Sequence, residues 1–308
     1  MKEAVPGYYQ NFQCIADRCK HSCCVGWEID IDDETMAFYE SLNTDLGDRI
    51  RKSIEGEEPH FILGPDERCP FLKEDGLCEL ICECGEEAIC EICSLHPRFK
   101  NFYPSFTEMG LGLCCEEAAR LILSAEEPFS VKMPENIQLT EEETMFLAIR
   151  QTIFAVLQDR NQNVKERFDS VAKLFGFSFD FSLKKAQKLY VSLERLDESW
   201  TDMLEGLKGF SFDESIFKSE KFQIFFEQLA VYFVFRHLAE AMWDGEYGAR
   251  VRFALLSCFL IGALCAQIES VNGQISFEKM ADVVRQYSAE IEYSEENVAK
   301  LMAELSCC

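Results

Sequence analysis

Beyond residue 140, apolar and polar positions alternate along the chain with the period of an α-helix. The first helix begins with Thr140 and Glu143, which have the spacing of a capping box, and is predicted to run to about residue 159. Its apolar residues recur at steps of three and four positions and form one stripe that faces a core. Further helices are predicted over residues 162–175, 183–206, 219–243, 249–270, 277–290 and 295–305.

Two of these segments are apolar around most of the helix surface. The segment 222–235 carries six aromatic side chains, which favours a central packing helix over a cofactor pocket. The uncharged stretch Phe253–Ile268 is 16 residues long, shorter than the roughly 20 residues that a membrane-crossing helix needs. We therefore expect a buried core helix there and no membrane span.

The first 125 residues show shorter and more mixed patterns. Apolar and polar residues alternate over Trp27–Asp32, which is the period of a half-buried strand. Helix signals then begin at Asp32 or Asp33 and run to about Ile54. This region is therefore predicted to combine short strands with short helices.

A β-hairpin is predicted over residues 71–80, because the Asp-Gly dipeptide at its centre readily adopts a tight turn. Such a hairpin would bring Cys69 and Cys78 together at its open end. A later helix, Glu116–Ala125, begins directly after Cys114-Cys115. Thiolates at that position would lie near the positive end of the helix dipole.

The composition changes near residue 125, and two prolines interrupt regular structure at positions 128 and 134. We therefore expect a domain boundary after residue 127. The predicted fold class is mainly α. Residues 1–127 form an N-terminal cysteine-rich α+β region that binds a metal or cluster and contains the short β-hairpin, and residues 128–308 form a C-terminal helical bundle.

The net charge is −25, from 30 basic and 55 acidic residues, and it speaks against a nucleic-acid partner because phosphate binding needs clustered Lys and Arg. An acidic surface suits a cationic ligand or peptide, and it also keeps a protein soluble. The first residues lack the apolar segment of a secretory signal, so we expect a cytoplasmic protein. In that reducing compartment, many cysteines favour metal or redox chemistry over a disulfide framework.

Twelve of the sixteen cysteines lie in the first 115 residues, and four of them form the block Cys14-x4-Cys19-x3-Cys23-Cys24. A loop that wraps an iron–sulfur cluster can use both members of the adjacent pair, because a cluster takes thiolates from wider angles than one tetrahedral zinc ion. Eight thiols, enough for two four-thiolate sites, come from this block together with Cys69, Cys78, Cys93 and Cys115.

The remaining cysteines have plainer interpretations. Cys258 and Cys265 are seven residues apart in an apolar helix, which predicts core packing. The terminal pair Cys307-Cys308 is expected to fray and to bind nothing. The spacing of three further cysteines is equally compatible with plain burial and with a metal-binding role: Cys82, Cys84 and Cys90.

Four blocks of the first 125 residues follow one another in an ordered pattern. They are Tyr9-x2-Phe12-x-Cys14-x4-Cys19-x3-Cys23-Cys24-x2-Trp27-x-Ile29-x-Ile31-Asp32, Cys69-Pro70-Phe71-Leu72-x3-Gly76-x-Cys78, Cys93-x3-Pro97-Arg98 and Cys115-Glu116-Glu117-Ala118-Ala119-Arg120. The pattern resembles the flagellin lysine-N-methylase family. The match covers about residues 5–125 and extends less clearly over the helical half.

The resemblance implies a cytosolic bacterial protein that methylates lysine side chains of flagellin. It implies S-adenosylmethionine as the methyl donor and an iron–sulfur cluster, of the 4Fe-4S type, on the cysteines; zinc is the alternative metal. The ligands that the resemblance implies are Cys14, Cys19, Cys23, Cys24, Cys69, Cys78, Cys93 and Cys115.

Some features depart from the family pattern or leave roles open. No glycine-rich loop follows a strand, so a methyltransferase with this sequence would not bind its donor on a doubly wound sheet. The compact CxxxCxxC signature of radical S-adenosylmethionine enzymes is missing as well. Four cysteines outside the pattern leave the choice of ligand ambiguous within each block: Cys82, Cys84, Cys90 and Cys114.

Two further residues and a second function stay open. Arg98 could orient a carboxylate of the donor, hydrogen-bond to cluster sulfurs or cap local structure. His21 lies inside the first cysteine block. It could replace a thiolate as a metal ligand, or it could stay neutral and hydrogen-bond to a thiolate that binds the metal. The alternative function is a non-enzymatic iron–sulfur or zinc-binding protein whose helical domain binds a partner.

Overall fold

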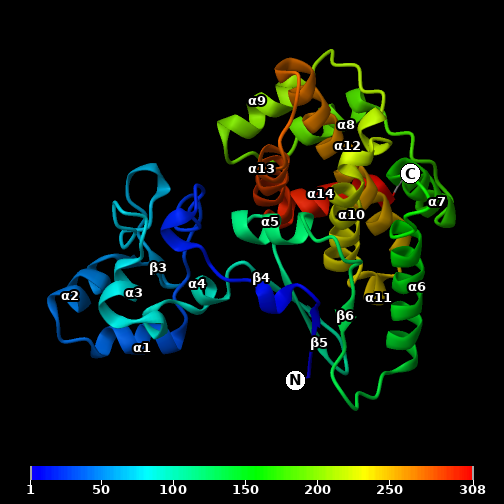
Figure 1. The fold of residues 1–308 in the computed structure, drawn as a ribbon. Helices are drawn as coiled ribbons and strands as arrows, with labels where there is room; N and C mark the ends of the chain where they lie inside the picture. Colours follow the sequence, from blue (N-terminus) through cyan, green and yellow to red (C-terminus); the bar gives the residue numbers. More distant parts are fainter. Residues whose placement is uncertain (1, 307–308) are drawn as a thin grey trace. The chain divides into compact units, whose positions relative to one another are not determined.

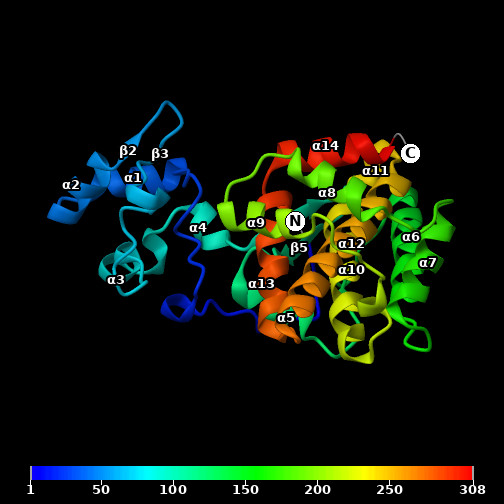
Figure 2. The same ribbon diagram turned by 90° about the horizontal axis from the view of Figure 1, so that it is seen from above.

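A computed structural model describes residues 2–306 of the chain, so the fraying predicted for Cys307-Cys308 lies outside the described residues. The described chain forms two compact units (Figures 1 and 2). The helical unit consists of residues 2–12, 100–114 and 118–306, and the cysteine unit of residues 13–99 and 115–117. Helices make up 57% of the structure, which confirms the mainly α class.

This division differs from the boundary expected after residue 127. Residues 2–12 and 100–114 belong to the helical unit because they contribute strands to a sheet there. The strands are β1 (Glu3–Pro6), β4 (Arg98–Phe102), β5 (Thr107–Leu111) and β6 (Val131–Lys132), in the order β4-β5-β1-β6. Strand β1 pairs in parallel with β5 and antiparallel with β6. Pairing between such distant segments is invisible to local composition.

The helical unit contains the helices α5 to α14, of which α5 starts in the cysteine unit. Their bounds are α5 Glu116–Leu123, α6 Glu141–Leu157, α7 Val164–Leu174, α8 Leu183–Val191, α9 Glu198–Gly206, α10 Gln223–His237, α11 Ala241–Asp244, α12 Tyr247–Asn272, α13 Phe277–Tyr287 and α14 Glu295–Ser306. These helices confirm the predicted helical bundle.

The helix starts follow the local sequence closely. Helix α6 opens with the predicted capping box: the Thr140 hydroxyl accepts from the Glu143 amide at 3.1 Å, and the Glu143 carboxylate accepts from the Thr140 amide at 2.7 Å. Ser182 and Ser276 likewise cap α8 and α13. The helix predicted over residues 277–290 ends as an α-helix at Tyr287, and a turn of π-helix, Ser288–Glu292, follows it.

Tertiary contacts interrupt the helix predicted over residues 183–206. The carboxylate of Glu290 accepts hydrogen bonds from the backbone amides of Leu196 and Asp197, both at 2.8 Å, and so holds this segment out of a helix. The Asp197 side chain then caps the new helix α9. The segment 219–243 is likewise divided, into a 3₁₀ turn, α10 and α11.

Helices α10 and α12 pack against each other in the core of the helical unit, as Figure 2 shows. Every residue of α10 from Phe225 to Phe235 is buried, which confirms the predicted central helix. Within the described part of the chain, α12 is the one helix long and apolar enough to cross a membrane, but 78% of its most apolar window is buried. It is therefore the predicted core helix. A Cβ on Gly262 would collide with the ring of Phe217, so glycine permits their close packing.

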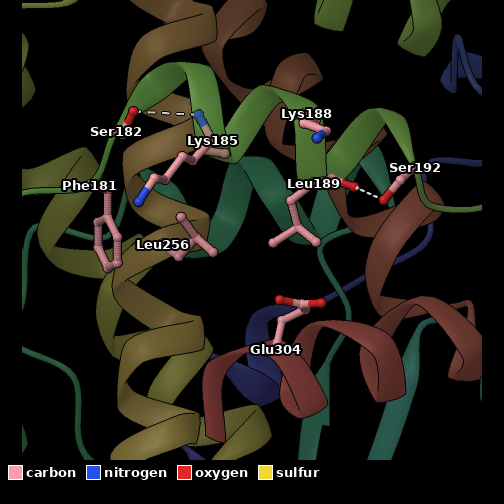
Figure 3. Close-up of a pocket in the computed structure, with 9 residues that line it drawn as sticks. Phe181, Ser182, Lys185, Lys188, Leu189, Ser192, Leu256 and Glu304 are labelled. Carbon is pink, nitrogen blue, oxygen red and sulfur yellow. Dashed lines mark hydrogen bonds between the residues drawn. The ribbon is translucent and has the colours of Figure 1, made fainter. Parts of the chain in front are cut away.

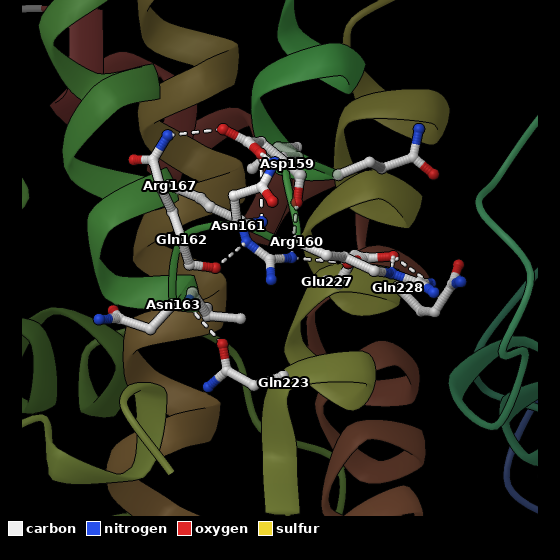
Figure 4. A network of polar contacts seen from close by, with 12 residues as sticks. Asp159, Arg160, Asn161, Gln162, Asn163, Arg167, Gln223, Glu227 and Gln228 are labelled. Carbon is white, nitrogen blue, oxygen red and sulfur yellow. Dashed lines mark hydrogen bonds and ion pairs between the residues drawn. The ribbon is translucent and has the colours of Figure 1, made fainter. Parts of the chain in front are cut away.

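The helical unit buries carboxylates that are paired with arginines. Glu108 on β5 is 0% exposed, and its two oxygens accept from the Arg150 guanidinium of α6 at 2.5 and 2.7 Å. The Tyr103 hydroxyl donates to the same carboxylate at 3.0 Å. Glu227 of α10 is bound in the same way by Arg160 and Arg167 (Figure 4). A buried charge persists only with such partners.

Replacing Glu108 by Leu should therefore destabilise the helical unit by about 3–5 kcal/mol, because the buried Arg150 charge loses its carboxylate partner. The double variant Glu108→Leu/Arg150→Met should recover part of this loss. Urea unfolding followed by far-ultraviolet circular dichroism measures both. The matched control is Asp169→Asn, which breaks an exposed pair with Lys165 and should cost no more than about 1 kcal/mol. Additive losses in the double variant would contradict the coupling.

The cysteine unit consists of short elements around a small apolar core. They are α1 Asp33–Ser41, α2 Asp45–Lys52, β2 Ile54–Glu55, β3 His60–Phe61, α3 Glu79–Cys84 and α4 Glu91–Leu95. Strands β2 and β3 form a two-stranded antiparallel sheet. The core combines apolar side chains such as Ile29, Phe61 and Phe71 with buried cysteines. This is the α+β, cysteine-rich region that the sequence predicts.

Three local predictions for this unit need correction. Residues 27–32 form no strand, although Ile29 and Ile31 are buried as the alternation requires; only an isolated bridge joins Asp30 to His60. The helix expected from residue 32 or 33 to 54 breaks between α1 and α2, where Thr44 caps the second helix. The hairpin over 71–80 shrinks to one bridge from Leu72 to Cys78, because α3 begins immediately afterwards.

Candidate functional site

Four cysteines that we call the outer thiols lie in the loop before residue 24 and at the start of α5. The Cys14 sulfur accepts from the Ala16 amide at 3.4 Å. The Glu116 carboxylate accepts from the Lys20 amide at 2.9 Å and from the Cys19 thiol at 3.7 Å, and it thereby ties the loop to the segment that carries Cys115. The outer thiols are Cys14, Cys19, Cys23 and Cys115.

The outer thiols neighbour one another electrostatically. The bond with Cys24 and burial raise the pKa of the Cys23 thiol, and thiolates at Cys14 and Cys115 would raise it further; a thiolate at Cys115 would also raise the pKa of Cys19. Burial raises the pKa of Cys19 to about 11. Two members of this group are exposed and two are partly exposed. The group is therefore accessible to solvent and to small reactants.

Five further cysteines, the inner thiols, gather in the core of the same unit. Cys69 and Cys90 are buried in this core, and the other three pack against it. The Cys69 amide donates to the Cys24 carbonyl oxygen at 2.9 Å. The Tyr39 hydroxyl lies 3.7 Å from the Cys90 sulfur. The inner thiols are Cys24, Cys69, Cys78, Cys90 and Cys93.

Thiol–thiol hydrogen bonds shape the protonation of both groups. A hydrogen bond from Cys23 lowers the pKa of Cys24 to about 6, helped by Ser22 and Arg68, and the same bond raises the pKa of Cys23. The pair Cys90 and Cys93 behaves alike: the pKa of Cys90 is lowered and that of Cys93 raised by their shared bond. Burial raises the pKa of Cys69 to about 12. Metal binding here would release protons.

These cysteines gather in one unit but, among the described residues, form no preformed site for a single metal ion. Zinc binds thiolates at about 2.3 Å, so its ligands must converge closely. Among residues 2–306, no three His, Cys, Asp or Glu side chains converge closely enough to hold one ion.

The structure thus brings all eight cysteines named from the sequence into one unit. It adds Cys90, which the sequence left undecided, to the inner thiols. Cys82 and Cys84 are exposed on α3, and Cys114 belongs to the helical unit. Cys258 and Cys265 are buried in α12, as predicted.

The other residues singled out in the sequence lie around the thiols. The Trp27 indole donates to the Cys23 carbonyl oxygen at 2.5 Å, and its ring lies 6.0 Å from the His96 ring. Burial lowers the pKa of His96 to about 4, and the charge of Arg98 adds to this effect. Arg98 is half-buried at the start of β4. His21 is exposed, and its backbone carbonyl accepts from the Cys19 thiol at 3.2 Å.

A surface cavity lies in each unit, and the two are of about the same size. In the helical unit, a cavity of about 430 Å³ lies beside α8, where Phe181 and Leu256 face Glu304 of α14 across an opening bordered by lysines (Figure 3). In the cysteine unit, a cavity of about 420 Å³ lies between Asp30 and Leu95. The Asp32 carboxylate in its wall caps α1 and accepts from the Glu91 amide, so its role is structural.

A buried polar network in the helical unit was not foreseen from the sequence. The Glu292 carboxylate, at the end of the π-helical turn, accepts from the His237 ring at 2.7 Å and from the Tyr232 hydroxyl at 3.2 Å. The Arg236 guanidinium lies 3.4 Å from the same carboxylate and donates to Tyr232. The Tyr232 hydroxyl in turn accepts from the Leu113 amide. These residues belong to separate segments, so no sequence motif marks them.

This network should make the helical unit sensitive to pH. Burial lowers the pKa of His237, so the folded protein does not take up the proton that unfolded His237 binds below about pH 6.5. The free energy of unfolding should therefore fall as pH drops from 7 towards 5. His237→Gln should flatten this slope. Urea titrations at several pH values measure it, and equal slopes in wild type and variant would contradict the assignment.

A family model matches the helical half of the chain. Residues 133–306 match the family model described as the FliB lysine N-methylase C-terminal domain. The chain is 30% identical over 146 residues to a lysine-N-methylase of Salmonella choleraesuis (strain SC-B67) and to one of Salmonella typhimurium (strain LT2); each match covers 44% of this chain and 36% of the relative. The chain thus spans only about a third of these curated relatives.

A third relative is matched over more of its length. The chain is 31% identical over 130 residues to the flagellar biosynthetic protein FliU of Salmonella muenchen, covering 39% of this chain and 75% of that protein. No solved structure matches the chain.

Proposed function

Because the chain belongs to the FliB lysine N-methylase family, we propose that it transfers methyl groups from S-adenosylmethionine to lysine side chains of flagellin. The observation that carries this proposal is the family match over residues 133–306. The names of the relatives support it, since two are lysine-N-methylases and the third is a flagellar biosynthetic protein. A cytoplasmic location suits a chain with sixteen cysteines, because reducing compartments favour thiol and metal chemistry over disulfides.

We further propose that the cysteine unit holds an iron–sulfur cluster of the 4Fe-4S type. The candidates for its four thiolate ligands are the eight cysteines named from the sequence, which the fold gathers into one unit. When bound, such a cluster would supply irons that exchange electrons. The exposed outer thiols would leave that side of the site open to reactants, whereas the inner thiols are shielded by apolar side chains.

Methyl transfer itself sets requirements that protein groups must meet. The lysine amine must be neutral when it attacks the methyl carbon; the bond from that carbon to the sulfonium sulfur then breaks, and S-adenosylhomocysteine leaves. The amine's proton passes to a base or to water. The net charge of −25 favours the approach of a lysine-bearing surface, and this attraction weakens as salt concentration rises.

The test is methyl transfer by anaerobically purified protein with labelled S-adenosylmethionine and flagellin from the same organism. Wild type should label flagellin lysines, and Cys14→Ser should lower the rate by about 100-fold or more, the size of effect seen when a metal site is disturbed. Cys84→Ser, an exposed cysteine of the same unit, is the matched control and should keep the wild-type rate. No label on lysine despite full metal loading would favour a non-enzymatic metal-binding protein with a helical partner-binding domain.

A further inference from the structure

A tryptophan side chain is exposed on the helical unit. Trp243 lies in the short helix α11 and is 62% exposed. Of the other two tryptophans in the chain, Trp200 is fully buried and Trp27 is partly buried. An indole ring in water forgoes the large stabilisation that its burial would bring, and tryptophan is enriched at the centres of protein interfaces. The position of Trp243 therefore suits contact with another molecule.

A second exposed apolar side chain lies on the neighbouring helix. Helices α11 and α6 pack against each other, and they lie side by side in both views (Figures 1 and 2). The Phe146 ring of α6 lies 6.4 Å from the ring of Tyr247 at the start of α12. Met145, the residue before Phe146, is 60% exposed. Two adjoining helices thus each present a large apolar side chain to solvent.

Acidic residues flank both of these side chains. Residues 133–149 and 238–249 contain no lysine or arginine, and the next basic residue, Arg250, is paired with Asp244. Acidic charge is not spread evenly over the unit, because α8 carries three lysines and no acidic residue. We call Trp243, Met145 and the five exposed acidic residues beside them in these segments the tryptophan surface; the five are Glu141, Glu142, Glu240, Asp244 and Glu246.

The chemistry of the tryptophan surface matches one class of partner. A lysine or arginine cation binds over the face of an indole ring, and nearby carboxylates attract it. The aliphatic part of a lysine side chain packs on apolar groups such as Met145 while its charged end stays in water. A second copy of this chain, with a net charge of −25, is repelled by the same carboxylates. The charge therefore selects a cationic segment.

We propose that the tryptophan surface binds a lysine-bearing segment of the protein substrate. The identity of this segment as part of the substrate rests on the proposed function; its cationic character rests on the surface itself. Binding here would hold the substrate protein on the helical unit and raise the local concentration of its lysines. The surface contributes binding energy and takes no part in the bond that forms, so its loss should change KM rather than kcat.

Peptide binding tests the surface without any methyl transfer. The probe is a short fluorescein-labelled peptide of alternating lysine and glycine, and fluorescence anisotropy at low salt gives its Kd for the full chain. Trp243→Ala should weaken binding about fivefold, and Trp243→Phe should retain part of the affinity because a phenyl ring still binds a cation. The double variant Glu142→Gln/Glu246→Gln should weaken binding and reduce its dependence on salt.

Two control variants match these changes elsewhere on the same unit. Val271→Ala removes a side chain that is 71% exposed at the end of α12 opposite to α11, and Glu205→Gln neutralises an exposed carboxylate on α9. Both should bind the peptide as the wild type does, and circular dichroism checks that every variant is folded. Equal affinity in wild type, Trp243→Ala and Val271→Ala would overturn the proposal.

Methylation kinetics link the surface to the substrate. With flagellin from the same organism, Trp243→Ala should raise KM about fivefold and leave kcat unchanged. An active wild type whose KM is unaffected by Trp243→Ala would refute the docking surface, whereas a wild type that binds the peptide but methylates nothing would refute only the proposed function. Sedimentation covers the other occupant: a wild-type dimer that Trp243→Ala abolishes would assign the surface to a second copy of the chain and overturn the proposal.

Discussion

The amide of Cys69 donates to the carbonyl oxygen of Cys24 at 2.9 Å, and this contact joins two segments that are far apart in the sequence. The first segment carries the opening cysteine block, and the second leads through a tight turn to Cys78. The contact lies against the apolar core of the unit, so burial of Phe61 and Phe71 and the gathering of thiols depend on the same packing. The loops that hold the outer thiols extend from this joint, with Glu116 as their second anchor.

The helical unit depends on a different constraint, which is the pairing of buried charges. Its core is large enough to bury the carboxylates of Glu108, Glu227 and Glu292, and each has cationic or hydroxyl partners. These pairs add little net stability compared with apolar residues, but they tie strand β5 to α6, α7 to α10, and α10 to the π-helical turn. Gly112 lies in the same unit. Any other residue at this position would have a Cβ that collides with the Tyr293 hydroxyl. Close packing on this segment therefore restricts both its sequence and its path.

Local sequence was a good guide wherever the structure is decided locally. The capping box at Thr140 and the aromatic helix α10 were predicted, because their signals lie within a few residues, and the serine caps of α8 and α13 are equally local. The prediction failed where distant groups compete for the backbone. Glu290 divides one predicted helix by binding two amides, and the start of α3 replaces the second strand of a predicted hairpin. The paired strands β1 and β5 were missed for the same reason.

The sequence by itself determined the class of the fold, the helical half, the family and the thiols that are candidates for metal binding. The fold class and helices follow from periodicity and capping, the candidate thiols from cysteine spacing, and the family from the resemblance of four short blocks; all are properties of short segments. Only the tertiary structure decided that Cys69 and Cys90 are buried in one apolar core and that Cys24, Cys78 and Cys93 pack against it. It also decided that Glu292, His237 and Tyr232 meet in one buried network. The physical reason is that these neighbours are set by packing between segments, and packing depends on the whole chain rather than on any one motif.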